Sequence, residues 1–227
     1  MKTVSRNLWH WIGMALSGAA ALSAGAWLVG PVIRGFLQLN AIQEADSQVA
    51  AWLHRAASPA LTEFLLWVSW VHGTVGILAL TAIVAAATWR YANRLPMAVL
   101  TVVVPGGLLL NVAIKHVVQR PRPDWGYAFQ ALETYSFPSG HTAGASLLYG
   151  VVVVLLWPRV RNSGARIGTV IGAGTLVLLV AMSRIVLGVH FLSDCIAAVI
   201  EAGVWLAICL VSARATGVFH SRMQASP

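Results

Sequence analysis

The stretch MSRIVLGVHFLSD, residues 182–194, places an arginine, a histidine and an aspartate between two apolar segments. Those segments, about 166–187 and 191–212, each have the roughly 20 apolar residues that a helix needs to cross a bilayer core of about 30 Å. Ionisable groups at membrane depth are costly and are functional by default. We therefore interpret residues 182–194 as the junction of two membrane helices and as a candidate functional site.

The composition of the whole chain indicates a membrane protein. Of its 227 residues, 58% are hydrophobic and only 10% are charged, and the mean hydropathy is +0.76. We predict an all-α, polytopic membrane protein in which residues 1–227 form a single membrane-embedded domain. The apolar run after Lys2 and Arg6 is too long for a signal peptide, whose core has about 7 to 15 residues, so we expect an uncleaved anchor. The six expected transmembrane helices are about 8–30, 61–88, 95–115, 141–158, 166–187 and 191–212.

The distribution of basic residues predicts the orientation of these helices. With a cytoplasmic N-terminus, the cytoplasmic segments hold nine of the fifteen Lys and Arg and none of the seven acidic residues. Both termini are then cytoplasmic, and the protein is a multi-pass protein of the cell (inner) membrane. The net charge of +8 is dispersed over short segments, so nucleic-acid binding is not expected. The nine residues are Lys2, Arg6, Arg90, Arg94, Arg159, Arg161, Arg166, Arg214 and Arg222.

Cys195 and Cys209 both lie on the last expected helix, fourteen positions apart. At 1.5 Å per residue they are about 21 Å apart, too far for a disulfide. We expect two small apolar residues in a packed helix.

Two extracytoplasmic connections are long. In residues 31–60, Ile42, Val49, Trp52 and Leu53 can form one face of a short amphipathic helix, which we expect to be a polar connector without chemistry. Residues 116–140 are rich in proline and glycine and carry most of the charge that orientation does not explain. The aromatic residues of this second connection suit either an interfacial belt or the sides of a lipid entrance: Trp125, Tyr127, Phe129 and Tyr135.

Three clusters of polar residues fall at helix ends on the same side of the predicted membrane. With alternating helix directions, the ends of the third and fifth helices and the starts of the fourth and sixth share one face, so one pocket can form from all four. The clusters are Lys115 with Arg122 and Pro123, then Pro138 to His141, and then Ser183 and Arg184 with His190 and Asp194.

The residue types of these clusters suit phosphate chemistry. Lys115, Arg122 and Arg184 supply one point charge and two planar forks, as expected around a phosphate dianion. Ser139 at a helix start, with Gly140 allowing close backbone approach, would direct N–H donors and the positive end of the helix dipole at an anion.

A nucleophile and an acid are also available. His190 and Asp194 are four residues apart and share one face of a helical turn, so the carboxylate can hold one ring nitrogen as N–H while the other keeps its lone pair. His141, from another helix, could protonate a leaving oxygen.

Together these residues resemble the three-part signature of the type 2 phosphatidic acid phosphatase (PAP2) superfamily. The pattern is Lys115-x6-Arg122-Pro123, Pro138-Ser139-Gly140-His141 and Ser183-Arg184-x5-His190-x3-Asp194, with all eleven defining positions matched in order within residues 115–194.

The resemblance implies a metal-independent phosphohydrolase that needs no cofactor and forms a phosphohistidine. By motif position, His190 looks like the nucleophile, Asp194 its orienting partner and His141 the general acid that then activates water. Lys115, Arg122, Ser139, Gly140 and Arg184 look like the groups that bind phosphate. As substrate we favour undecaprenyl pyrophosphate at the extracytoplasmic, periplasmic face, on family habit alone. Phosphatidylglycerophosphate, phosphatidate and lipid A phosphates are the alternatives.

Two other kinds of site remain open. A metal site could use His116, His141, His190, Asp124 and Asp194, although the neighbouring cations would repel a metal ion. A lipid transporter could bind phosphate in the same pocket without reacting, although the internal repeats of many transporters are not seen. His72 and Glu201 lie within expected helices, and we interpret both as hydrogen-bonded packing residues.

Overall fold

The structure is a computed structural model that describes residues 2–91, 95–124 and 134–215. These residues form eight helices and no strand, so the predicted all-α class is confirmed. The helices are α1 (Lys2–Leu37), α2 (Asn40–Ala56), α3 (Pro59–Val71), α4 (Thr74–Tyr91), α5 (Leu95–Val118), α6 (Gly140–Leu156), α7 (Ser163–Val186) and α8 (Leu192–Ala215).

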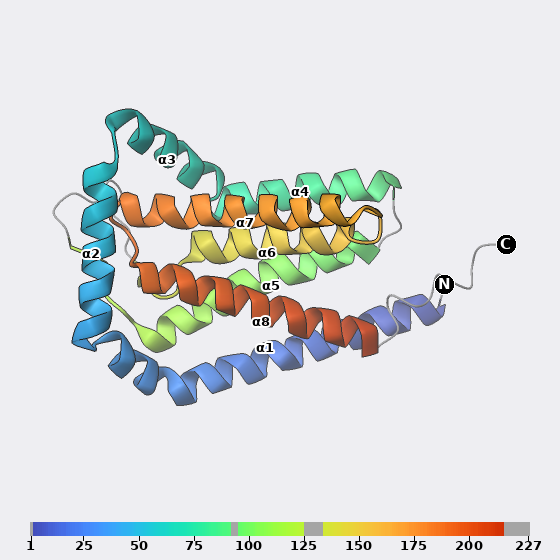
Figure 1. Ribbon diagram of the computed structural model, residues 1–227. Coiled ribbons are helices and arrows are strands. Elements are labelled where there is room, and N and C mark those ends of the chain that lie inside the picture. The colour runs from blue at the N-terminus through green and yellow to red at the C-terminus, as the bar shows by residue number, and fades with distance from the viewer. Residues whose placement is uncertain (1, 92–94, 125–133, 216–227) are drawn as a thin grey trace.

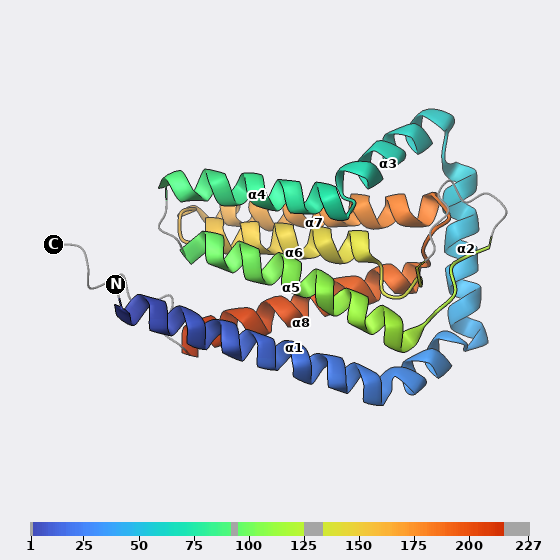
Figure 2. The ribbon, with the colours of Figure 1, turned by 180° about the vertical axis from the view of Figure 1, so that it is seen from behind.

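Helices α1 and α4 to α8 run along a common direction, and α2 lies across one end of the bundle (Figures 1 and 2). The start of α1 and the end of α8 lie at the opposite end (Figure 1). Both described ends of the chain are therefore on the same side. That this side is cytoplasmic remains a prediction.

The expected membrane helix at 61–88 is wrong as a single element. It is broken into α3 and α4, which meet at an angle of 62° around His72 and Gly73. The physical reason lies at Gly76, where an added Cβ would be 1.9 Å from the carbonyl oxygen of Val71. Glycine lets the end of α3 fold against the start of α4, a bend that a continuous apolar run does not predict.

The number of membrane spans is settled only in part. Within the described residues, three helices are long and apolar enough to cross a membrane, and the bent pair of α3 and α4 raises this to four. The apolar parts of α5 and α6, Val102–Val118 and Gly140–Leu156, are shorter. The first helix is also longer than the expected 8–30, since α1 continues through Pro31 to Leu37. Six spans therefore remain a prediction.

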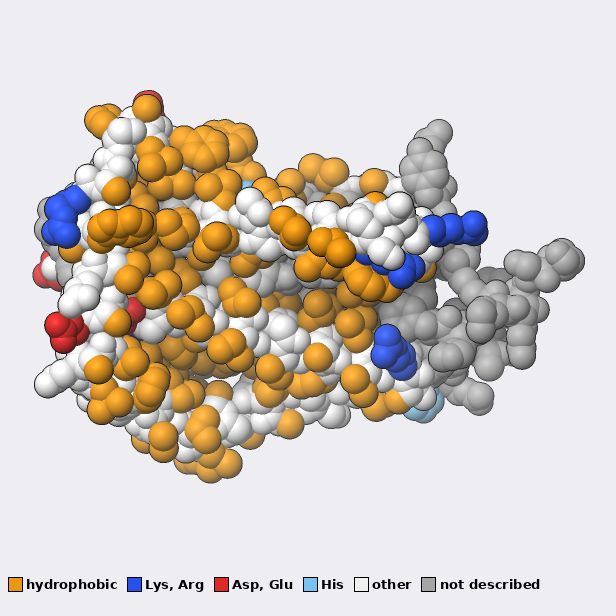
Figure 3. Space-filling view, in the orientation of Figure 1, with side chains coloured by type: hydrophobic (Ala, Val, Ile, Leu, Met, Phe, Trp, Pro, Cys, Tyr) orange, Lys and Arg blue, Asp and Glu red, His pale blue; other side chains and the backbone are white. Residues whose placement is uncertain are grey.

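The sides of the bundle are apolar, as a lipid-facing surface requires. Trp27, Trp70, Ile171 and Ile200 are all more than half exposed. Figure 3 shows hydrophobic side chains along the bundle, acidic side chains at the α2 end, and Lys and Arg at both ends. On this face, the charged side chains of the described residues thus lie at the two ends of an apolar bundle, as in a membrane protein.

Two buried tryptophans hold the centre of the bundle. Trp11 of α1 donates from its indole Nε1 to the carbonyl oxygen of Cys209 at 3.0 Å, and Trp205 of α8 donates to that of Val103 at 2.8 Å. Each ring fills core volume and also has a partner for its polar atom. Cys195 and Cys209 are buried and unpaired, as expected.

Gly107 of α5 makes this packing possible. An added Cβ would lie 2.5 Å from Cδ1 of Leu147 and 2.8 Å from Cδ1 of Trp205, both in the core. Small residues at such contacts let membrane helices approach closely.

We predict that Gly107→Ala lowers the unfolding temperature in detergent by about 5 °C, since overpacking costs about 1–3 kcal/mol. Gly172→Ala on α7 is the matched control, because an added Cβ there meets nothing within 4 Å. Thermal unfolding of both variants checks the prediction. Equal unfolding temperatures for the two variants would show that the contact of Gly107 with Leu147 and Trp205 is not tight.

Candidate active site

The ends of α5 and α7 and the starts of α6 and α8 meet at the α2 end of the molecule (Figures 1 and 2). Two short segments complete the site, residues 119–124 after α5 and 187–191 between α7 and α8. Gly188, at φ 73°, turns the chain there. The sequence prediction that four helix ends share one side agrees with this arrangement.

His190 and Asp194 contact each other through His190 Nδ1 and Asp194 Oδ2, at 3.4 Å. Both side chains are almost fully buried. The predicted placement on one helical turn is wrong, because His190 precedes α8 and only Asp194 is within it. Asp194 Oδ2 also accepts the N–H of Phe191 at 2.9 Å, a helix-start contact that folds the carboxylate back toward His190.

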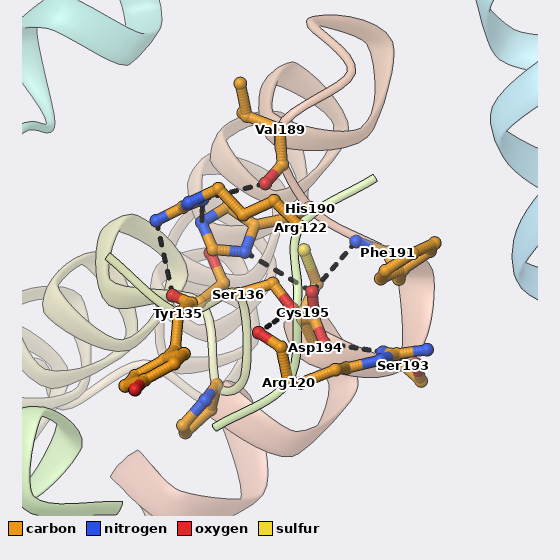
Figure 4. Close-up of polar contacts among 12 residues, drawn as sticks. Arg120, Arg122, Tyr135, Ser136, Val189, His190, Phe191, Ser193, Asp194 and Cys195 are labelled. Atoms are coloured by element: carbon orange, nitrogen blue, oxygen red, sulfur yellow. Dashed lines mark hydrogen bonds and ion pairs between the residues drawn. The ribbon is translucent and has the colours of Figure 1, made fainter. Parts of the chain in front are cut away.

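Arg122 determines the tautomer of His190. Its Nη1 lies 3.2 Å from His190 Nε2 and donates to the carbonyl oxygen of Val189 at 2.8 Å (Figure 4). A guanidinium is only a donor, so Nε2 must carry the lone pair and Nδ1 the hydrogen that faces Asp194. The geometry thus assigns a nucleophilic nitrogen on the side where Arg122 lies.

His190 is also held in its neutral form. Burial lowers the pKa of His190 to about 3, from the ordinary 6.5, despite the nearby Asp194. The ring is therefore uncharged at neutral pH, as a nitrogen nucleophile must be.

Arg122 also holds a second segment against the site. Its Nε donates to the carbonyl oxygen of Thr134 at 2.6 Å, and its Nη2 to Thr134 Oγ1 at 2.8 Å and to the Tyr135 carbonyl at 3.3 Å. The guanidinium therefore joins the segment before α6 to the segment that carries His190.

Among the described residues, the side chain of Lys115 donates hydrogen bonds to backbone carbonyl oxygens only. Its Nζ donates to the carbonyl oxygens of Tyr135 at 2.9 Å, Ser136 at 3.3 Å and Pro138 at 2.5 Å. The side chain is buried at 9% exposure. In this structure Lys115 holds the 135–138 segment, so its phosphate-binding role remains a prediction.

The start of α6 lies beside Asp194. Ser139 precedes the helix, and its N–H donates to the carbonyl oxygen of Asp194 at 3.1 Å, while its Oγ accepts from Thr142 Oγ1. The N–H of Ser139 is therefore engaged inside the protein, and the role of the first-turn N–H groups of α6 in binding an anion remains a prediction. Gly140 is the first residue of α6, and the dipole of that helix points to the site.

His141 and Arg184 approach from two other sides. His141 lies near His190, Arg122 and Arg184, and a Cβ added at Gly73 would be 3.7 Å from its Nε2, so the ring lies beside the α3–α4 break. Arg184 is fully buried at the end of α7, and its Nη1 donates to Ser69 Oγ of α3. The structure thus brings all eight residues predicted for the site to one end of the bundle.

Arg120 and Asp46 are the contacts that the sequence analysis missed. Arg120 Nη1 donates to Asp194 Oδ1 at 2.6 Å, and its Nη2 to Asp46 Oδ2 at 2.8 Å. The 31–60 connection, expected to be a polar connector without chemistry, is linked to the site, since Asp46 of α2 contacts Arg120 and Arg120 contacts Asp194. A signal was available, because Asp46 lies between Ile42 and Leu53 on the face expected to be apolar.

His72 and Glu201 are hydrogen-bonded, as expected. His72 Nδ1 is 2.8 Å from the Val68 carbonyl oxygen and Nε2 is 2.7 Å from the hydroxyl of Tyr149. Glu201 Oε2 accepts from Asn111 Nδ2 at 2.8 Å.

No group of three His, Cys, Asp or Glu side chains able to hold a metal ion occurs in the described part of the chain. His116 instead places its ring edge-on to that of Tyr135. Trp125, Tyr127 and Phe129, expected to form either an interfacial belt or the sides of a lipid entrance, lie outside the described residues.

A cavity of about 370 Å³ borders the site. It lies between the end of α1, α2 and residues 118–124, and Arg120, Arg122 and Phe191 form the side toward His190. The other polar side chains that line it are Arg34, Gln38, Gln43, Ser47, Gln119 and Asp124. This volume falls within the range of small-molecule sites, about 300–1,000 Å³.

Comparison with known proteins points to one family. A family model described as the PAP2 superfamily matches residues 94–217, more than half of the chain. Phosphatidylglycerophosphatase B of Bacillus subtilis (strain 168) is 28% identical over 164 residues, which are 72% of this chain and 80% of that protein.

Two solved structures share the fold. The transmembrane PAP2 type phosphatidylglycerolphosphate phosphatase from Bacillus subtilis matches with a TM-score of 0.72 and 24% identity, over 89% of this chain and 98% of that one. LpxE from Aquifex aeolicus matches with a TM-score of 0.57 and 18% identity, over 74% of this chain and 94% of that one.

We predict that Lys115→Met increases amide hydrogen exchange in residues 134–139 by about tenfold or more, since it removes three hydrogen bonds that hold this segment. Arg34→Met is the control, as Arg34 is exposed at the same end. Exchange measured by mass spectrometry checks the prediction. An unchanged rate would mean that the lysine does not hold the segment.

Proposed function

Because the chain belongs to the PAP2 superfamily and is a membrane-bound lipid phosphatase, a hydrolase of phosphate esters, we propose that His190 takes the terminal phosphate of a glycerophospholipid and passes it to water. The observation that carries this proposal is the orientation of His190. Its Nδ1–H faces Asp194, and its Nε2 lone pair faces Arg122, a group that binds phosphate oxygens well.

In the first step, Nε2 of His190 attacks phosphorus and the bond from phosphorus to the lipid oxygen breaks. His141 donates a proton to that oxygen, so the lipid leaves as an alcohol. Arg122 and Arg184 both lie near His141 and would balance the charge of the phosphoryl group in the transition state. The positive charge on the phosphorylated imidazole is opposed by Asp194.

In the second step, His141 takes a proton from water as the water attacks phosphorus. The bond from phosphorus to Nε2 breaks, inorganic phosphate leaves and neutral His190 returns. Lys115, Ser139 and Gly140 support both steps by holding the segment that opens α6, with the positive end of its dipole toward the anion.

The comparisons favour a glycerophospholipid over the undecaprenyl pyrophosphate that the sequence analysis preferred. A curated relative and a solved structure are both named for phosphatidylglycerophosphate hydrolysis. The cavity beside Arg120 and Arg122 supports the same alternative, because its glutamine and serine side chains suit the hydroxyl groups of a glycerol headgroup.

We further propose that the site faces the extracytoplasmic side of the cell membrane. The loop between α6 and α7, with Arg159 and Arg161, and the end of α8, with Arg214, lie at the opposite end of the bundle (Figure 1). Cytoplasmic loops are enriched in such residues.

We expect purified protein in detergent to release phosphate faster from phosphatidylglycerophosphate than from phosphatidate or undecaprenyl pyrophosphate. His190→Ala should lower kcat by about 10³-fold or more, because it removes the nucleophile. Phosphate release from this panel is the measurement. A preference for the pyrophosphate would restore the substrate that the sequence favoured, and full activity of His190→Ala would refute the mechanism.

We also predict full activity in excess EDTA, since phosphoryl transfer depends on positioning and charge neutralisation, which arginines can supply here. The same phosphate assay with and without EDTA checks this. A large loss of turnover that a divalent cation restores would contradict it.

A further inference from the structure

Helix α2 buries a carboxylate on the face that it packs against the bundle. Asp46 is only 2% exposed and lies on the same face as the buried Ala50 and Leu53. An unpaired charge in such a place would cost several kcal/mol. Its partners therefore explain why this position tolerates an aspartate.

Within the described part of the chain, the side-chain hydrogen bonds of Asp46 all lead to the active site. Oδ1 accepts the backbone N–H of Ser193 at 2.9 Å, and Oδ2 accepts the Ser193 hydroxyl at 2.6 Å and Arg120 Nη2 at 2.8 Å. Ser193 directly precedes Asp194 in α8. Asp46 thus holds the backbone of Ser193 and the guanidinium of Arg120. Both lie beside Asp194, the carboxylate that contacts His190.

Arg120 occupies the space between the two carboxylates. Its Nη1 donates to Asp194 Oδ1 at 2.6 Å and to Ser193 Oγ at 2.7 Å, and its guanidinium lies 3.9 Å from the ring centre of Phe191. Figure 4 shows Arg120 on the side of Asp194 away from His190. A continuous chain of contacts therefore runs from Asp46 through Arg120 and Asp194 to His190.

The charges of the side chains in this series of contacts suit the proposed reaction. Two carboxylates share one guanidinium, so the group carries one net negative charge beside neutral His190. Phosphorylation of Nε2 would leave the ring positive, because Nδ1 keeps its hydrogen. The ring, the two carboxylates and the guanidinium would then sum to zero, apart from the charge on the phosphoryl oxygens. Without Asp46, Arg120 would neutralise Asp194 before the reaction, and these side chains would offer the positive ring no net counter-charge.

We propose that Asp46 and Arg120 are positioning residues for phosphoryl transfer, which fix the carboxylate of Asp194 and maintain its negative charge toward His190. This proposal rests on the function proposed above, with His190 as nucleophile. It gives α2 a role in the reaction although α2 supplies no residue to the signature motifs.

The first test is Asp46→Asn, which removes the charge and keeps the shape. We expect kcat to fall about 10–100-fold with KM within about threefold, as for other partners that orient a reacting group. Glu44→Gln is the matched control, the same change on an exposed side chain of α2, and should stay within about twofold. A wild-type kcat for Asp46→Asn would overturn the proposal.

A double-mutant cycle separates positioning from general structural damage. If Asp46 acts through Asp194, Asp46→Asn should change kcat by less than about twofold in an Asp194→Asn background. Independent, multiplicative losses would overturn the proposal. Should Asp46→Asn not fold, Arg120→Lys replaces it, since lysine cannot reach both carboxylates as a planar fork. A wild-type rate of His190 phosphorylation in Arg120→Lys would refute the proposal equally.

A failure of the role proposed for Asp46 and Arg120 can be distinguished from a failure of the proposed function. If the wild-type protein releases no phosphate from any lipid phosphate, or His190→Ala remains active, the phosphohistidine mechanism fails. If the wild type is active and His190→Ala is not, an active Asp46→Asn refutes only the role of Asp46 and Arg120.

Discussion

The carboxylate of Asp194, buried at the start of α8, is the group around which the site is arranged. It contacts His190, the N–H of Phe191 and Arg120, and its backbone carbonyl accepts the N–H of Ser139. Through these bonds one residue joins the start of α6, the segment before α8 and the segment after α5. A buried charge must be paired, so these segments cannot separate without a large cost in free energy.

Basic side chains at this end of the molecule also hold neighbouring segments of the chain in place. Lys115 and Arg122 hold the 134–138 segment through its carbonyl oxygens, and Arg120 joins α2 to α8. Positive charges are thereby fixed in place before any substrate arrives. Such preorganised charge stabilises a transition state without the cost of reorientation, which is how the arginines here can serve phosphoryl transfer.

The sequence predicted the residues of the site better than their individual contacts. The convergence of His141, Arg184 and His190 followed from alternating helix directions, a constraint that the bilayer imposes on any polytopic chain. The break between α3 and α4 could not be read from a continuous apolar run, because it depends on the fit of Gly76 against Val71. The link from Asp46 to Arg120 was missed because 74 residues separate them and only packing brings them together.

The sequence by itself determined the all-α membrane class, the family signature and the kind of chemistry, since hydropathy and motif spacing are local properties of the chain. The tertiary structure alone decided which donor meets which acceptor. It assigned Lys115 to backbone carbonyls, gave His190 its tautomer through Arg122, and placed Asp46 behind Asp194. Hydrogen bonds are short and directional, so these assignments depend on the helix packing, which no pattern along the chain specifies.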